Sequence, residues 1–203
     1  MKDKPKAKVR KFLFKPASVL LLLFSLLVTQ IFSVYAAGVW ENVGTAGFSA
    51  GSASFTSLAV YNGTPYVAYR DDDNFHKATV MKFNGSTWEN VGTAGFSAGG
   101  AEYISLAVYN GTPYVAYRDI ANSYKATVMK FNGSTWENVG TAGFSAGEVE
   151  YISLAIYNGT PYVAYQDDAN SEKATVMKFD GTNWVNIGTA GFSAGGASYT
   201  SLA

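Results

Sequence analysis

The hydrophobic pattern of this chain repeats every 48 residues, and each repeat holds four short runs typical of β-strands. In the second repeat, β-branched and aromatic residues dominate positions 103–109, 112–118, 125–131 and 135–139. Asn-Gly pairs separate the first two runs and the last two, and such a pair is a strong signal for a tight hairpin turn. No window after residue 37 has helical spacing, so each repeat predicts four antiparallel strands.

Tryptophans mark the period of the repeat, because four of them stand 48 residues apart. Units of four strands at this length are typical of β-propeller blades. Apolar residues occupy both faces of the predicted strands, as expected when blades stack face to face. We therefore predict an all-β protein, a β-propeller of four-stranded antiparallel blades; a linear β-stack or solenoid is the alternative. The predicted repeats are residues 40–87, 88–135 and 136–183, followed by a partial unit at 184–203.

One part of the repeat resembles a known family. The segment KATVMKFNGSTWENVG, from the third strand to the tryptophan strand, looks like the second half of a kelch blade. The Gly-Gly pair that kelch blades carry after the second strand is missing, and Arg-Asp or Gln-Asp stands there. Near-identical blades of this length are also similar to lectin propellers of the tachylectin-2 kind and to repeats of secreted bacterial proteins. The resemblance implies a propeller fold and transfers no binding residue.

The N-terminal segment differs from the repeats. Basic residues crowd positions 1–16, an apolar run follows at 19–28, and small residues come next. This order is typical of a secretory signal peptide, here residues 1–36 with cleavage after Ala36. It predicts a secreted or cell-surface protein whose propeller domain is 37–203. An uncleaved anchor near this segment is the alternative, and it would be the chain's link to a membrane.

Charge and cysteine content narrow the function classes. The formal net charge of the whole chain is zero, but the predicted signal peptide holds many of its basic residues. The remaining part is acidic and has no basic stripe, which argues against nucleic acid as a partner. Because the chain has no cysteine, disulfides and thiol chemistry are excluded.

Differences between the repeats concentrate in two connections. These are the link into the next unit, at 100–104 in the second repeat, and the loop after the second strand, at 120–124. In an antiparallel four-stranded blade both connections emerge at the same end, where propellers commonly bind. The alternative is that the sequences of longer loops vary because these loops contribute little to packing.

An Asp-x-x-Asn-x-x-Lys pattern recurs in the variable loop beside an Arg or Gln. The pattern predicts a polar ligand site suited to sugars, with nearby tyrosines as stacking surfaces. The alternative is a structural loop in which Asp bonds its own backbone and Asn takes a left-handed turn. The candidate ligand-binding residues are Arg70, Asp71, Asn74, Tyr103, Arg118, Asp119, Asn122, Tyr151, Gln166, Asp167 and Asn170.

Neither a metal, a cofactor nor a catalytic residue is predicted. The acidic run 71–74 invites a calcium site, but it lacks the Gly and distal acid of a known loop. His76 is the sole histidine, and Tyr124 and Glu172 replace it in the other repeats, so no Ser-His-Asp set is available. A paired-carboxylate glycosidase needs two differently tuned acids, which near-identical units do not naturally provide.

The sequence thus predicts a non-enzymatic binding module with repeated weak sites for carbohydrate or a surface protein, gaining avidity by repetition. A spacer propeller without a ligand is the alternative, and a glycan-active enzyme is the third candidate. The chain opens on a tryptophan strand and stops within a first strand, which favours a fragment of a longer protein. An intact short chain would instead close by self-association through its open blade edges.

Overall fold

The computed structural model describes residues 39–203, and Asn42–Ala203 form one compact unit. The predicted signal peptide at 1–36 lies outside the described residues. Among the described residues, no helix has the length and apolar character needed to cross a membrane.

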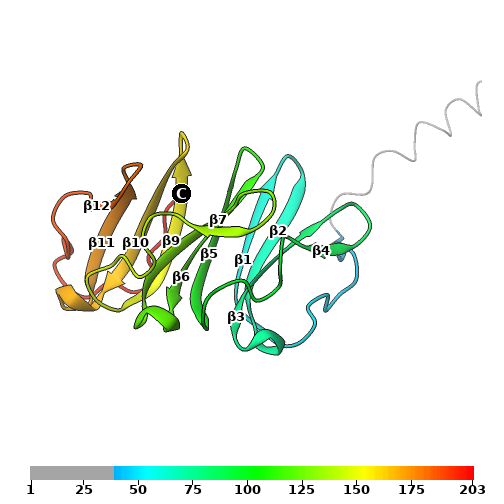
Figure 1. Cartoon of the computed structure of the whole chain (residues 1–203), viewed down its shortest axis with the longest axis horizontal. Coiled ribbons are helices and arrows are strands. Elements are labelled where there is room, and N and C mark those ends of the chain that lie inside the picture. Colours follow the sequence, from blue (N-terminus) through cyan, green and yellow to red (C-terminus); the bar gives the residue numbers. More distant parts are fainter. Residues whose placement is uncertain (1–38) are drawn as a thin grey trace, which may run out of the picture. The chain divides into compact units, whose positions relative to one another are not determined.

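Residues 39–203 form three four-stranded antiparallel sheets (Figure 1). Each sheet combines three strands of one predicted repeat with the tryptophan strand that opens the next. We call these sheets blades 1, 2 and 3, and in each the strands follow one another in chain order. Blade 1 contains β1 (Ala53–Tyr61), β2 (Thr64–Asp71), β3 (Lys77–Phe83) and β4 (Trp88–Asn90); blade 2 contains β5 (Ala101–Tyr109), β6 (Thr112–Asp119), β7 (Lys125–Phe131) and β8 (Trp136–Asn138); blade 3 contains β9 (Val149–Tyr157), β10 (Thr160–Asp167), β11 (Lys173–Phe179) and β12 (Trp184–Asn186). A short 3-10 turn follows the second strand of each blade: η1 (Asp72–Asn74), η2 (Ile120–Asn122) and η3 (Asp168–Asn170).

The two Asn-Gly turns of a blade are built differently. Between the first two strands, Asn110 and Gly111 both have positive φ, 48° and 78°, as a two-residue type I′ hairpin requires. In the turn before the tryptophan strand, only the glycine has positive φ. There the side-chain oxygen of Asn132 accepts hydrogen bonds from the backbone N–H groups of Ser134 and Thr135, at 3.0 and 2.9 Å. Asparagine thus serves once as a left-handed residue and once as an acceptor.

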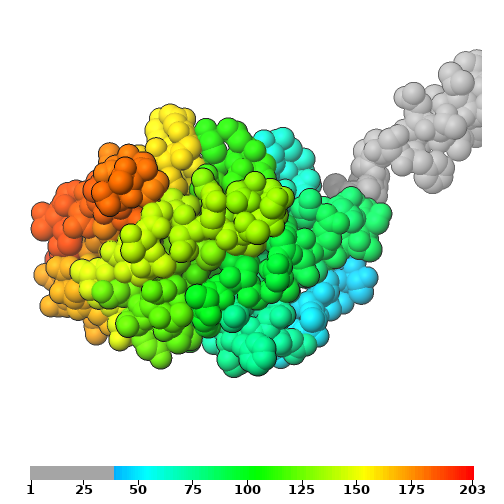
Figure 2. All heavy atoms as spheres, in the orientation of Figure 1, coloured from blue at the N-terminus to red at the C-terminus, as the bar shows by residue number. Residues whose placement is uncertain are grey.

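The hydrophobic cores lie between blades. One core combines buried residues of blade 1, such as Val80 and Val91, with Leu106 and Val115 of blade 2. The second repeats the arrangement between blades 2 and 3. In the space-filling view, neighbouring blades are in contact (Figure 2). Each sheet therefore buries both of its faces wherever it has a neighbour, as the apolar pattern on both faces predicts.

We name the two faces of a blade by their neighbours. The leading face packs against the preceding blade and carries Leu106 in blade 2; the trailing face packs against the following blade and carries Val91 in blade 1. Hydrogen bonds between blades reinforce the packing. The indole N–H of Trp136 donates to the carbonyl of Val91 at 2.8 Å, and the backbone N–H of Leu106 donates to Ser57 Oγ at 3.0 Å. Both bonds recur at the next interface, from Trp184 and Leu154.

The leading face of blade 1 has no blade before it among the described residues. Leu58 of β1 is 65% exposed, whereas its counterpart Leu106 is 6% exposed in the same sequence context, Ser-Leu-Ala-Val-Tyr. Comparing these two leucines therefore isolates what packing between blades contributes to stability, because the strand sequence around them is the same.

We predict that Leu106→Ala lowers the free energy of unfolding by about 2–5 kcal/mol, because it leaves a cavity between blades 1 and 2. The matched Leu58→Ala variant is expected to change it by less than about 0.5 kcal/mol, because the side chain is exposed. Urea unfolding followed by tryptophan fluorescence measures both. Equal destabilisation of the two variants would contradict packing between blades as the source of stability.

Candidate functional site

Aromatic side chains form a column across the first strands of the blades. Phe55, Tyr103, Tyr151 and Tyr199 follow one another with ring centroids 5.2, 5.0 and 4.6 Å apart. All four have left-handed backbones, with φ between 48° and 55°. In β1 and β5, these residues lie at the irregular step in pairing with the second strand, which is where a bulge re-aims a side chain. Holding a non-glycine residue there costs on the order of 1–3 kcal/mol, and such strain is concentrated at functional sites.

The aromatic column lines a shallow groove of about 240 Å³, together with Thr56, Ile104 and Ile152. The polar residues beside it come from the second strands. The guanidinium of Arg70 lies 5.3 Å from the ring centre of Phe55, and that of Arg118 lies 5.9 Å from the ring centre of Tyr103. The structure thus brings together four of the sequence-predicted residues: both arginines, Tyr103 and Tyr151.

Arg118 forms ion pairs with carboxylates of two blades. Its Nη1 lies 3.2 Å from Glu102 Oε2 of its own blade, and its Nη2 lies 2.9 Å from Glu148 Oε2 of the link into blade 3. Glu150 of blade 3 is 3.9 Å from the same Nη1. The neighbouring interface is sparser, because Arg70 meets Glu102 at 3.6 Å and Asp72 at 3.4 Å. Charge is therefore densest where blades 2 and 3 meet.

Blade 3 carries acids at this end that the other blades do not carry together. Glu148 replaces Gly100 of blade 2, and Asp168 replaces Ile120. The two acids are neighbours, since the backbone N–H of Asp168 donates to the carbonyl of Glu148 at 3.2 Å. Asp168 is an exposed residue, and partial desolvation followed by repulsion from Glu148 and Glu172 raises its pKa above the ordinary value. The sequence analysis missed this pair, although the comparison of repeats contains the signal.

The aspartates predicted as ligands are structural. Asp119 is 1% exposed, and its carboxylate accepts bonds from Asn122 Nδ2 and Thr127 Oγ1, each at 2.8 Å. Its other oxygen accepts from the backbone N–H of Ala121 at 3.1 Å. Asp71 and Asp167 take the same asparagine and threonine partners in their blades.

These contacts shape the loop, and ligand binding stays a prediction for Asp71, Asn74, Asp119, Asn122, Asp167 and Asn170. The alternative interpretation, a self-bonded loop, holds with one change. The left-handed residues are the two after the asparagine, Ser123 and Tyr124 in blade 2, rather than the asparagine itself. Gln166, the counterpart of the arginines, is buried at 7% exposure.

His76 and the acidic run belong to the loop of blade 1. Its Nδ1 lies 2.9 Å from Asp72 Oδ1, and this hydrogen bond, with help from Arg70, lowers the pKa of Asp72. Within residues 39–203, no group of three or more His, Cys, Asp or Glu side chains is placed to hold a metal ion.

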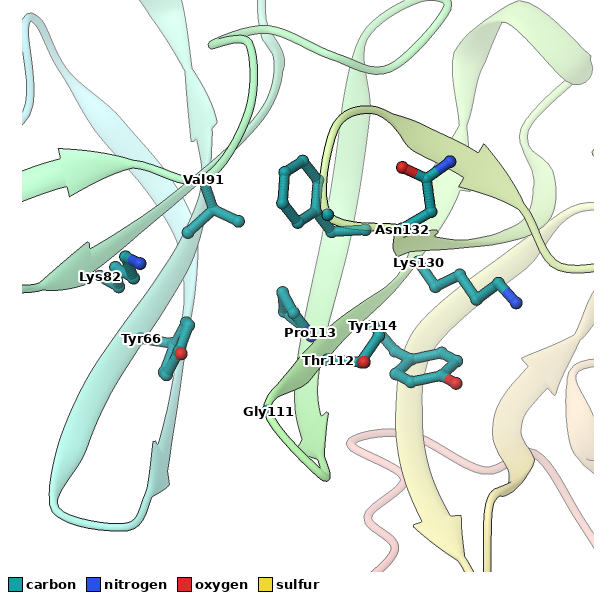
Figure 3. Close-up of a pocket in the computed structure, with 11 residues that line it drawn as sticks. Tyr66, Lys82, Val91, Gly111, Thr112, Pro113, Tyr114, Lys130 and Asn132 are labelled. Atoms are coloured by element: carbon teal, nitrogen blue, oxygen red, sulfur yellow. The ribbon is translucent and has the colours of Figure 1, made fainter.

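A second hollow lies at the opposite end, between blades 1 and 2, with a volume of about 390 Å³. Figure 3 shows Tyr66, Lys82 and Val91 on its blade 1 side, while Lys130 and Tyr114 of blade 2 point away from the gap. Its polar groups do not converge, and no carboxylate lines it. The groove beside the arginines is therefore the better candidate site.

Comparison with known proteins shows the fold. No protein-family model matches the chain, and no curated protein matches it. Among solved structures, a triple arginine-to-alanine mutant of AofleA from Arthrobotrys oligospora matches with a TM-score of 0.53 and 14% identity, over 74% of this chain and 46% of that one. A glycosyl hydrolase from Bacteroides ovatus matches with a TM-score of 0.44 and 15% identity, over 68% and 49%. An alpha-L-arabinofuranosidase from Clostridium thermocellum gives 0.44 and 14%, over 66% and 54%.

The chain thus spans about half the length of these three structures. At such identities the likeness shows the fold alone. The three four-stranded antiparallel sheets, together with the AofleA match, confirm the predicted all-β propeller type.

The predicted function needs correction. The sequence analysis predicted a non-enzymatic binding module, with a spacer propeller as the alternative, and no enzyme. The glycoside hydrolases among the matched structures contradict both statements. The sequence analysis argued that near-identical repeats do not naturally provide two differently tuned acids, whereas blade 3 carries Glu148 and Asp168, which the other blades do not carry together.

We predict that Asp119→Ala lowers the free energy of unfolding by about 2 kcal/mol, because it leaves three buried or half-buried donors without an acceptor. The control is Asp73→Ala, an exposed acid in the loop of blade 1, which is expected to have little effect. Urea unfolding compares the two. An unaltered stability of Asp119→Ala would make this carboxylate a candidate ligand again.

Proposed function

We propose that this chain belongs to a glycan-active enzyme that hydrolyses a glycosidic bond with Asp168 and Glu148. The observation that carries the proposal is the acid pair of blade 3, which breaks the repeat beside an arginine and a tyrosine-lined groove. Glycoside hydrolysis uses two carboxyl groups on either side of the scissile bond. Their environments must differ, so that one keeps its proton while the other acts as a base.

The environments of the two acids differ in this way. The raised pKa of Asp168 lets it keep a proton at higher pH than an ordinary aspartate, which suits a general acid that protonates the leaving oxygen. Glu148 instead pairs with Arg118 at 2.9 Å, and it acts as the carboxylate partner. Asp168 gives its proton to the leaving oxygen as the glycosidic bond breaks, and Glu148 takes a proton from the water that bonds to the sugar carbon.

The groove supports binding of the sugar chain. Tyr103 and Tyr151 offer aromatic surfaces to sugar rings, and the Arg118 guanidinium, 5.9 Å from the Tyr103 ring, lies beside that surface. The blade layout, which resembles kelch and lectin propellers, supports a rim that contacts glycans. The predicted signal peptide supports a secreted or cell-surface location, where polymeric glycans are met.

Removing either acid is expected to reduce the rate of hydrolysis by about 10²–10⁴-fold, the usual contribution of a positioned acid or base. The test measures new reducing ends from xylan, arabinan, xyloglucan and pectin for wild type, Asp168→Asn and Glu148→Gln. The matched control is Asp72→Asn, the counterpart of Asp168 in blade 1, which is expected to keep the wild-type rate. Activity that survives both blade 3 substitutions would overturn the assignment, and so would a wild type inactive on all four polymers.

The pH dependence follows from the raised pKa of Asp168. Because the general acid must be protonated, the rate is expected to fall as pH rises through that pKa, above the range of an ordinary aspartate. Neutralising Glu148 removes one of the charges that raise the pKa. The residual rate of Glu148→Gln should therefore begin to fall with rising pH at a lower pH than the rate of the wild type. A fall in rate at the same pH in both enzymes would contradict the effect of the Glu148 charge on the pKa of Asp168.

A further inference from the structure

The first and last blades present opposite apolar faces to solvent. On the leading face of blade 1, Leu58 and Val60 are 65% and 63% exposed. On the trailing face of blade 3, Tyr157 and Phe192 are 68% and 59% exposed, and Ile187 is 41% exposed. The counterparts of Leu58 and Ile187 in the interfaces between blades, such as Leu106 and Val139, are each 6% exposed.

These two faces complement one another, because the chain already joins such faces twice. A trailing face meets a leading face between blades 1 and 2, and again between blades 2 and 3. The ring of Tyr61 lies over Gly111 of the next blade, and Tyr109 lies over Gly159. Tyr157 continues this series, and its counterpart partner is Gly63 on blade 1.

We propose that a second copy of this chain docks head to tail, with its blade 1 on the trailing face of blade 3. The interface continues the one between blades and uses the same contacts. It is heterologous, since the two copies contribute different faces, and such contacts close when the rotation returns on itself. Two copies provide six complete blades, within the range of about 4–8 in closed propellers, so we expect a closed dimer.

Docking requires two exchanges of equivalent segments, and the first concerns the link before a blade. Residues 44–51 and 188–195 have the same sequence, GTAGFSAG, and both would occupy the link at the joint. In the free chain, the first segment and the residue before it contact Trp88. The Trp88 indole N–H donates to the Val43 carbonyl at 2.8 Å, and its ring stacks on Phe48 with the ring centroids 4.2 Å apart.

We expect the second segment, rather than the first, to occupy the link between the two copies. It is bonded to blade 3, with Phe192 N–H donating to the Ala174 carbonyl at 3.0 Å and Ile187 N–H donating to the Val176 carbonyl at 2.8 Å. It offers Trp88 of the incoming copy the same two partners, the carbonyl of Ile187 and the ring of Phe192.

A second exchange concerns the chain end. Residues 197–203 lie along β9, where Leu202 N–H donates to Ser153 Oγ at 3.0 Å. They are not part of a sheet in the described chain. The incoming β1 carries the same Ser-Leu-Ala sequence, so Leu58 N–H takes over the bond to Ser153, and β1 also brings its own sheet. The bonds of the Trp88 indole and of Ser153 thus have equivalents in the docked pair, and the two exposed faces become buried.

Sedimentation equilibrium of the full chain tests the proposal. Wild type is expected at twice the monomer mass, and Leu58→Asp at the monomer mass, since a charge then faces the apolar trailing surface. Leu58 is exposed in the monomer, so an unchanged circular dichroism spectrum should accompany the dissociation of the dimer, whereas the melting temperature should fall because the contact between copies no longer stabilises the fold. The control for added charge is Ser134→Asp, in an exposed turn of blade 2, which should remain dimeric.

Mixing two variants distinguishes head-to-tail contact from other modes. Leu58→Asp damages the leading face and Phe192→Asp the trailing face, so each alone is expected to be monomeric. Mixed together, they retain one intact pair of faces and should form a heterodimer. A monomeric wild type would overturn the proposal and leave these faces to other blades or proteins. Association that survives Leu58→Asp would also overturn it, because the contact would then lie elsewhere, for example in the apolar segment at 19–28.

Discussion

The structure depends on the contact between the trailing face of one blade and the leading face of the next. Each four-stranded sheet is apolar on both sides, so every side that a neighbouring blade covers adds to its stability. Within residues 39–203, the two hydrophobic cores are these contacts, and they lie between neighbouring sheets. Stability is therefore added one interface at a time, as in other repeat architectures.

Face-to-face stacking also decides where chemistry can occur. With both faces buried, polar side chains reach solvent at the two ends of the blades, through turns and loops. One end is closed by near-identical Asn-Gly turns. At the other, a buried aspartate fixes the loop after the second strand, and the first strands turn their aromatic residues outward through left-handed backbone. The loop aspartate thus contributes indirectly, by placing the residues that follow it.

Repetition and specialisation coexist in this chain. Stacking requires the same buried residues in every blade, whereas the loop ends are free to differ. The groove of aromatic rings is shared by all blades, but the acids Glu148 and Asp168 are found together in blade 3 alone. Because Arg118 reaches across from blade 2, the resulting cluster belongs to an interface rather than to one repeat. A chemically distinct site can thus arise from nearly equal units.

The sequence by itself determined the strands, the hairpin turns and the four-stranded unit, because hydrophobic alternation and Asn-Gly pairs act over a few residues. It also indicated one end of the blades as the candidate binding end, and four of the residues named there lie close together, Arg70, Tyr103, Arg118 and Tyr151. The sequence did not show whether the Asp119 carboxylate is buried and structural or exposed and free to bind a ligand, since the recurring loop pattern is the same in both cases. Only the tertiary structure decided that, because burial and the contact of Arg118 with Glu148 depend on how one blade packs against the next.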